Sequence, residues 1–294
     1  MPSINTLIKD VENVVTKDNW FHHDDAQRYS SEMASRVMER LVGEERTPGL
    51  RLSSMGERCP RSLWASVHSP SVQEKFPAHV RIKFHFGDVI EAMAIALAKA
   101  AGHMVTGEQD EVIVDGVKGH LDCILDGCIV DVKSINSLGF QKIKAKQVAE
   151  DIFLRSYLDQ LDGYLVGSLD DDRVVVKDRA YIWAIDKQMG HMCLYEHRLR
   201  EQRIKERIRE AKSIISLREA PACTCGTIAE GTNGNIKLDL KASYNPYKYF
   251  CFPECRTFIY AGGKPQHLIK VVKTPSYQGR PLVEVDREGK IVYN

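Results

Sequence analysis

Residues 119–133 read Gly-His-Leu-Asp-Cys-Ile-Leu-Asp-Gly-Cys-Ile-Val-Asp-Val-Lys, two apolar runs joined by Asp126-Gly127. An Asp-Gly pair between apolar runs is typical of a two-residue hairpin turn, which predicts antiparallel strands over Val117–Leu125 and Cys128–Lys133. Asp122 on the first strand and Asp131 on the second are then expected to lie near each other across the hairpin. The turn therefore brings two carboxylates together.

Asp131 and Lys133 are two residues apart on the second strand, so both point to one face while Val132 points into the core. Two close carboxylates repel each other unless a cation lies between them, and oxygen ligands suit a hard divalent ion such as Mg²⁺ or Mn²⁺. Such an ion polarises a phosphate, and a nearby lysine can orient the attacking water. This arrangement predicts phosphodiester hydrolysis, although Asp-Val-Lys alone is also a common surface pair.

The hairpin lies within a series of regular elements. Apolar residues recur at helical spacing over Arg81–Ala101, which carries Glu91 in its middle and ends before Gly102. A strand over Met104–Val114 would complete an antiparallel meander. Other elements are expected as two helices up to Val42, helices over Arg58–Val67, Leu138–Val148, Asp151–Val166 and Leu199–Leu217, and strands over Arg173–Val176 and Ala180–Asp186. Their order predicts an α/β fold.

Composition sets wider limits on the protein. The chain has 294 residues, is 43% hydrophobic, and holds 41 Lys and Arg against 40 Asp and Glu. This length suffices for one full core with appendages, and the balanced charge neither favours nor excludes DNA as a partner. No apolar run is long enough to span a bilayer and the start of the chain is polar, which predicts a cytosolic protein with reduced cysteines and no membrane partner.

The chain resembles the PD-(D/E)XK nuclease superfamily, specifically the RecB-like exonucleases that include CRISPR-associated and phage recombination nucleases. The resemblance covers about Arg58 to Asp186. Its four stretches are Phe86-Gly87-Asp88-Val89-Ile90-Glu91, Gly119-His120-Leu121-Asp122, Asp131-Val132-Lys133 and Gln160-Leu161-Asp162-Gly163-Tyr164. The resemblance implies a restriction-endonuclease-like core, a mixed central sheet flanked by helices.

The resemblance also implies roles for individual residues. The metal ligands would be the side chains of Glu91, Asp122 and Asp131 and the main-chain carbonyl of Val132. Lys133 would position the attacking water. Gln160 and Tyr164, four residues apart on one helix face, would reach the active site or the DNA backbone, whereas a plain structural helix face is the alternative. Arg58 and Arg61 flank the start of the core and are expected to contact DNA phosphates.

Cys59 resembles the isolated cysteine that supplies one ligand of a [4Fe–4S] cluster in some RecB-like exonucleases. The C-terminal part contributes Cys223, Cys225, Cys251 and Cys255, although the gap between Cys225 and Cys251 is longer than in that family. Three alternatives stay open: a cluster using Cys59 with late cysteines such as Cys225, Cys251 and Cys255, a zinc site of the four late cysteines, and reduced thiols without metal.

The expected domain organisation has three parts. The chain is predicted to have an N-terminal helical extension over 1–50, a nuclease core over 51–218 and a cysteine-bearing region over 219–294 that packs on the core. Its predicted function is that of a Mg²⁺-dependent DNA exonuclease, a hydrolase of recombination, repair or phage DNA metabolism, in the host cytoplasm if a phage encodes it. A structure-specific or restriction-like endonuclease and a catalytically inactive DNA-binding module are the alternatives.

Overall fold

The structure is a computed structural model that describes residues 2–42, 48–56, 58–76, 78–259 and 265–292. The chain forms two compact units. The first contains Met1–Gly56 and Phe76–Arg209, and the second contains Glu57–Lys75 and Glu210–Asn294. This division differs from the three expected segments, because the stretch at 57–75 folds with the cysteine-bearing C-terminal segment and not with the core.

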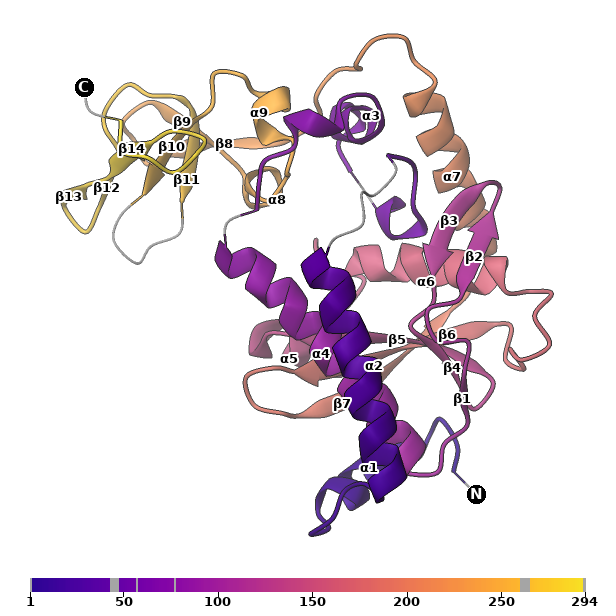
Figure 1. Cartoon of the computed structure of the whole chain (residues 1–294). Coiled ribbons are helices and arrows are strands. Elements are labelled where there is room, and N and C mark those ends of the chain that lie inside the picture. Colours follow the sequence, from indigo (N-terminus) through magenta and orange to yellow (C-terminus); the bar gives the residue numbers. More distant parts are fainter. Residues whose placement is uncertain (1, 43–47, 57, 77, 260–264, 293–294) are drawn as a thin grey trace. The chain divides into compact units, whose positions relative to one another are not determined.

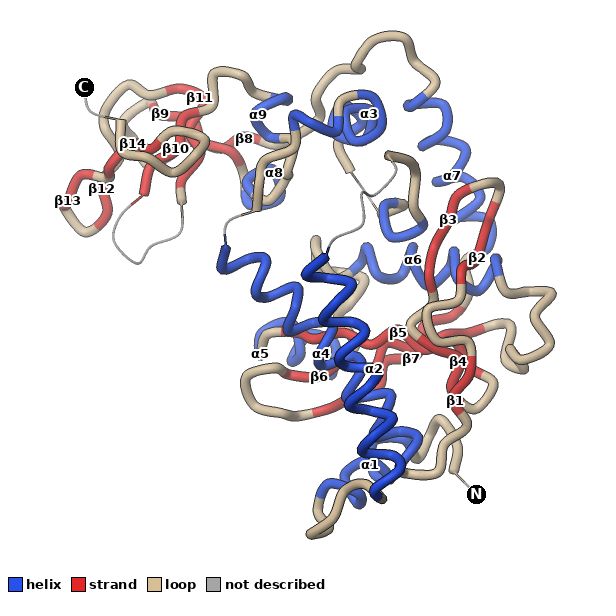
Figure 2. Tube along the Cα trace, viewed as in Figure 1, coloured by secondary structure: helices blue, strands red, loops and turns tan. Residues whose placement is uncertain are grey.

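A five-stranded mixed sheet forms the centre of the first unit, with strand order β1-β4-β5-β6-β7 (Figures 1 and 2). The strands are β1 (Val105–Thr106), β4 (Cys123–Leu125), β5 (Cys128–Ile135), β6 (Arg179–Asp186) and β7 (Met192–Arg198). β5 and β6 are parallel and the other neighbours are antiparallel. The first unit therefore has the predicted mixed α/β architecture, consistent with a restriction-endonuclease-like core.

Helices cover the sheet of the first unit. Those that contact its strands are α1 (Leu7–Val15), α4 (Ala78–Ala100), α5 (Ser137–Lys144) and α6 (Arg155–Gly167). The helix α2 (His23–Val42) packs on α4, and α7 (Glu201–Ile215) continues into the second unit. Val130 and Val132 of β5 belong to the same buried cluster as Ile95 of α4. Since side chains alternate along a strand, Asp131 lies on the other face of β5, where α6 contacts the sheet. Val132 is thus a core residue, as predicted.

Two Asp-Gly turns form in the first unit, and the predicted turn at Asp126-Gly127 is one of them. Asp126 and Gly127 have φ of 50° and 77°, and they join Leu125 to Cys128 in the β4–β5 hairpin. Asp115-Gly116 joins β2 (Glu111–Val114) to β3 (Val117–His120) in the same way. Positive φ at both central residues matches the right-handed twist of the strands, which is why this dipeptide favours the hairpin.

Two of the predicted strands are each divided into two shorter strands, and a third predicted strand does not form. The stretch Met104–Val114 splits into β1 and β2, because Gly107 and Gln109 adopt positive φ between them. Val117–Leu125 similarly splits into β3 and β4, so β2 and β3 form a separate two-stranded ribbon. Arg173–Val176 forms no strand; its residues Val175 and Val176 only donate backbone hydrogen bonds to the carbonyl of Gly127.

The second unit combines short helices with a five-stranded antiparallel sheet of order β14-β10-β11-β9-β8. Its helices are α3 (Pro60–His68), α8 (Leu240–Ser243) and α9 (Lys248–Cys251), and its sheet strands are β8 (Thr227–Glu230), β9 (Asn235–Leu238), β10 (Arg256–Ile259), β11 (Gln266–Lys270) and β14 (Val283–Val285). Ser276–Tyr277 and Arg280–Pro281 form a further small hairpin, β12–β13. A cavity of about 460 Å³ beside Phe258 and Leu282 contains none of the predicted site residues.

No helix in the described part of the chain is both long enough and apolar enough to cross a lipid bilayer.

Candidate functional site

Asp131 and Lys133 form the centre of the candidate active site in the first unit. The side chain of Asp131 is fully buried, and its Oδ1 accepts a hydrogen bond of 2.6 Å from Lys133 Nζ. The Lys133 ammonium also lies 5.2 Å from the ring centroid of Tyr157 on α6, a residue that the sequence did not single out. A carboxylate and an ammonium group thus share one face of β5, as the alternation predicted.

Asp122 lies beside this pair. It directly precedes β4, and the hairpin register, in which Cys123 pairs with Val130, places it opposite Asp131. Its Oδ2 accepts a hydrogen bond of 2.7 Å from the backbone N–H of Val132. The hairpin therefore brings the two aspartates together as expected.

Glu91 approaches the pair from α4. Its Oε1 accepts a hydrogen bond of 2.8 Å from Gln109 in the loop between β1 and β2. Burial raises the pKa of Asp131, Lys133 opposes that rise, and the charge of Glu91 adds to it. Glu91 is therefore close enough to interact electrostatically with Asp131, although the two residues come from different elements.

The charges of the aspartates act on Lys133 as well. Burial opposes its ammonium charge, but the nearby carboxylates of Asp131 and Asp122 outweigh burial, so the pKa of Lys133 is raised above its ordinary range. Opposite charges at short range favour each other's ionised form, which explains the direction. The four predicted residues thus form one electrostatically connected group.

A metal ion in this group needs carboxylate oxygens that hydrogen bonds leave unoccupied. The second carboxylate oxygen of Asp131, Oδ2, is buried and accepts no hydrogen bond from any described residue. A buried carboxylate oxygen without a partner is costly, and a hard divalent cation is one way to satisfy it. The carboxylates of Glu91, Asp122 and Asp131 are not as compact as the thiol group described below, whose ligand atoms all lie within 4.8 Å.

Gln160 and Tyr164 share a face of α6, as predicted, and Gln160 Nε2 donates a hydrogen bond to the Tyr164 hydroxyl. Burial and the charge of Asp131 raise the pKa of Tyr164. Tyr164 is almost fully buried. The pair therefore lies near Asp131, but Tyr164 packs mainly as a core residue.

Ion pairs hold α6 in place on its other face. Asp159 and Asp162 are buried. Arg200 Nε donates to Asp162 at 2.9 Å and Arg200 Nη2 to Asp159 at 2.9 Å, while Asp162 is also 2.6 Å from His197 Nε2 of β7. Arg203 adds a second cation to Asp159. This network ties α6 to β7 and α7 and so fixes the helix that faces Asp131.

Arg58 and Arg61, the predicted DNA contacts, belong to the second unit. Arg58 is exposed. Arg61 makes structural contacts: its guanidinium lies 4.9 Å from the Phe250 ring centroid, and it donates to the carbonyls of Phe250 and Pro221 at 3.4 Å and 3.3 Å. These contacts occupy part of the donor capacity that a phosphate would need. Phosphate binding by either arginine stays a prediction.

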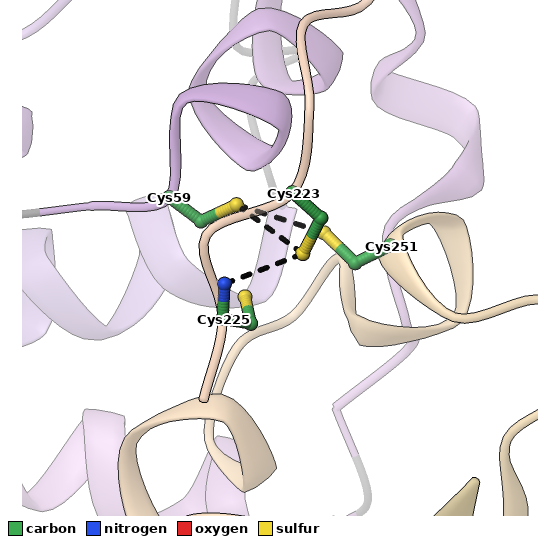
Figure 3. Close-up of side chains that lie close together, drawn as sticks. All are labelled: Cys59, Cys223, Cys225 and Cys251. Atoms are coloured by element: carbon green, nitrogen blue, oxygen red, sulfur yellow. Dashed lines mark hydrogen bonds between the residues drawn. The ribbon is translucent and has the colours of Figure 1, made fainter. Parts of the chain in front are cut away.

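Four cysteines gather in the second unit: Cys59, Cys223, Cys225 and Cys251 (Figure 3). Cys59 immediately precedes α3, Cys251 ends α9, and the other two lie in the segment before β8. All four are half-buried free thiols. Hydrogen bonds from Cys225 and Cys251 lower the pKa of the Cys59 thiol well below its ordinary value.

Cys255 was one of the predicted cluster ligands, but it does not belong to this group. Cys223 lies in the group instead. Cys255 is buried in a small apolar cluster with Leu238 and Ala242. Its thiol therefore packs as a small hydrophobic side chain, which its sequence position alone did not reveal.

The chain matches no family model, and no curated protein is similar to it in sequence. In structure it is similar to the crystal structure of SSO0001, with a TM-score of 0.43, 15% identity, and coverage of 76% of this chain and 95% of that chain. It is also similar to LHK-Exo in complex with dAMP, with a TM-score of 0.40, 12% identity, and coverage of 64% and 91%. A further crystal structure of this alkaline exonuclease, from Laribacter hongkongensis, has a TM-score of 0.36 at 12% identity, again with coverage of 64% and 91%.

Proposed function

We propose that the first unit is a metal-dependent nuclease that hydrolyses DNA phosphodiester bonds. The observation that carries the proposal is the buried Asp131 carboxylate, which is paired with Lys133 through one oxygen and finds no hydrogen-bond partner among the described residues at the other. Asp122 and Glu91 add negative charge at the same place. Carboxylate oxygens around a buried position suit Mg²⁺ or Mn²⁺.

In this proposal each residue has a distinct role. Glu91, Asp122, Asp131 and the carbonyl of Val132 would hold the cation, which when bound supplies positive charge to the phosphate and lowers the pKa of water. Lys133 would orient the attacking water, because its ammonium is held beside Asp131 and over the Tyr157 ring. Gln160 would extend the polar surface toward the DNA backbone. Arg58 and Arg61 are proposed as phosphate contacts.

Exonuclease action is the finer part of the proposal, with a role in recombination, repair or phage DNA metabolism. The test uses end-labelled linear DNA and covalently closed circular DNA, single- and double-stranded, with Mg²⁺, with Mn²⁺ and with chelator. We expect metal-dependent degradation of linear DNA only, since a closed circle offers no end. Cleavage of the circle would instead identify an endonuclease.

Variants separate catalysis from binding. Lys133→Gln and Asp131→Asn should each lower cleavage by at least ~100-fold, as expected when a positioned group of the site is removed, while DNA binding in Ca²⁺ stays within a few fold. Lys118→Ala is the matched control, because Lys118 is an exposed lysine of β3 paired with Glu111. Wild-type protein that binds DNA but shows no metal-dependent cleavage would contradict the nuclease proposal and favour the inactive binding module.

A further inference from the structure

The sulfur atoms of the four-cysteine group lie at the spacing of ligands around a single ion. A Zn–S bond of about 2.3 Å places the sulfurs of a tetrahedral site about 3.8 Å apart. Cys59 Sγ is 3.7 Å from Cys223 Sγ and 3.9 Å from Cys251 Sγ, and no two of the four sulfurs are more than 4.8 Å apart. Figure 3 shows the four side chains converging on one point.

This spacing disfavours the other chemistries open to four cysteines. In a [4Fe–4S] cluster each thiolate binds a different iron, so the iron and sulfide atoms lie between the thiolates and hold them further apart than ligands of one ion. A disulfide needs sulfurs about 2.05 Å apart, much closer than the 3.7 Å between Cys59 and Cys223. The geometry therefore favours one ion.

Hydrogen-bond donors surround the sulfurs. The backbone N–H of Thr224 donates to Cys59 Sγ at 3.4 Å, and that of Cys225 donates to Cys223 Sγ at 3.4 Å. The side-chain amide of Asn245 donates to Cys225 Sγ at 3.3 Å. Donors directed at sulfur stabilise thiolate charge and orient the ligand lone pairs, as in the outer shell of metal sites. The surroundings are thus prepared for thiolates.

We propose that Cys59, Cys223, Cys225 and Cys251 bind one Zn²⁺ as a structural site of the second unit. Tetrahedral sets of four thiolates are typical of zinc, and a site with four protein ligands leaves no open position for water or substrate. The ion would join the segment 57–75, through Cys59, to the segment 210–294. The proposal is independent of the nuclease proposal, because its ligands and its test lie outside the carboxylate group.

The first test is metal analysis of the full-length protein, expressed with both zinc and iron in the medium. We expect about one zinc per chain, no acid-labile sulfide and no visible colour, as for a closed four-thiolate site. Iron with acid-labile sulfide would overturn the proposal in favour of a cluster. One iron without sulfide, or protein without bound metal, would also overturn it.

Variants test the ligand set. Cys59→Ser and Cys223→Ser should lose bound zinc, whereas Cys255→Ala, a control at a late cysteine outside the group, should keep about one zinc per chain. Cys225→His distinguishes the loss of a ligand from misfolding, because histidine is also a zinc ligand. This variant should keep zinc. Its Co²⁺-loaded form should show weaker thiolate-to-metal absorption than the wild type. Loss of zinc from Cys255→Ala but not from Cys223→Ser would overturn the assignment.

Discussion

At the scale of single residues, two buried titratable groups differ in the neighbouring charge that they meet. Asp131 is buried next to a cation, Lys133, which opposes the effect of burial on its carboxylate. His267 of β11 is buried near a cation: Thr257 Oγ1 is 3.0 Å from its Nδ1, and the charge of Lys248 opposes its protonation. Burial and Lys248 lower the pKa of His267 to about 4. The fold therefore keeps this imidazole neutral.

The neutral state of His267 predicts how stability depends on pH. The pKa of His267 in the folded protein is about 4, below the ordinary value of 6.5. Its contribution to the free energy of unfolding is therefore complete above pH 6.5 and is lost as the pH falls through 4. The difference between these two pKa values corresponds to about 3 kcal/mol in the free energy of unfolding. Urea unfolding of the full chain at pH 7 and pH 4 should show this loss in wild type and a smaller loss in His267→Gln.

The exposed histidine His22 supplies the control, since His22→Gln should retain the wild-type pH dependence. If His267→Gln and the wild type lost the same free energy of unfolding between pH 7 and pH 4, the prediction would be contradicted.

At the scale of elements, a short 3₁₀ helix, Leu52–Ser54, fits between β3 and α6 of the first unit. The fit depends on glycine. A Cβ at Gly119 would lie 2.8 Å from Leu52 Cδ1 and 2.9 Å from Tyr164 Cε1, and one at Gly163 would lie 3.0 Å from Leu52 Cδ2. The glycine of the Gly119–Asp122 stretch therefore has a packing role: it lets Leu52 and Tyr164 approach the strand that leads to Asp122.

Gly119→Ala should consequently destabilise the protein by about 1–3 kcal/mol through overpacking, measured by urea unfolding. Gly87→Ala is the matched control: outside its own helix backbone, a Cβ on this α4 glycine meets no atom of the described residues within 4 Å, so it should stabilise by about 0.5–1 kcal/mol.

Leu52→Val should partly relieve the strain in Gly119→Ala, because the two sites share atoms and their effects should not add. Additive free energies of unfolding for the double variant would show that the contact with Leu52 is not the cause.

At the scale of the whole molecule, each unit is built from two separate stretches of the chain. Those of the second unit are 57–75 and 210–294. In the described part of the chain, the four-cysteine group is one place where these two segments meet through side chains that can share an ion. Closing so long a stretch of chain costs entropy, which an ion bound only by the folded state would offset.

Metal removal should therefore weaken the second unit selectively. After treatment with a strong chelator, amide hydrogen exchange should accelerate at least ~10-fold over 58–75 and 210–259, while β4, β5 and β6 keep their protection. Exchange that accelerates equally in the sheet of the first unit would contradict a site whose effect is confined to the second unit. Cys255→Ala protein, with and without chelator, serves as the reference.

Much of the candidate active site followed from local signals. The Asp126-Gly127 turn sets the hairpin register, and the register places Asp122 beside Asp131, because a two-residue turn leaves little choice of pairing. Strand alternation placed Lys133 on the face of Asp131, and helical spacing placed Gln160 with Tyr164. These relations need only a few neighbouring residues, so the sequence by itself determined them.

Other relations depend on residues far apart in the chain, and only the tertiary structure decided them. Tyr157 lies under Lys133 because α6 packs on that face of β5, and Cys59 joins Cys223, Cys225 and Cys251 because the segment 57–75 folds with the C-terminal one. Cys255 is excluded because its side chain packs among apolar residues. Spacing along the chain carries no information on such contacts. The cysteines have the same chemistry, and the packing of distant elements decides which of them lie together.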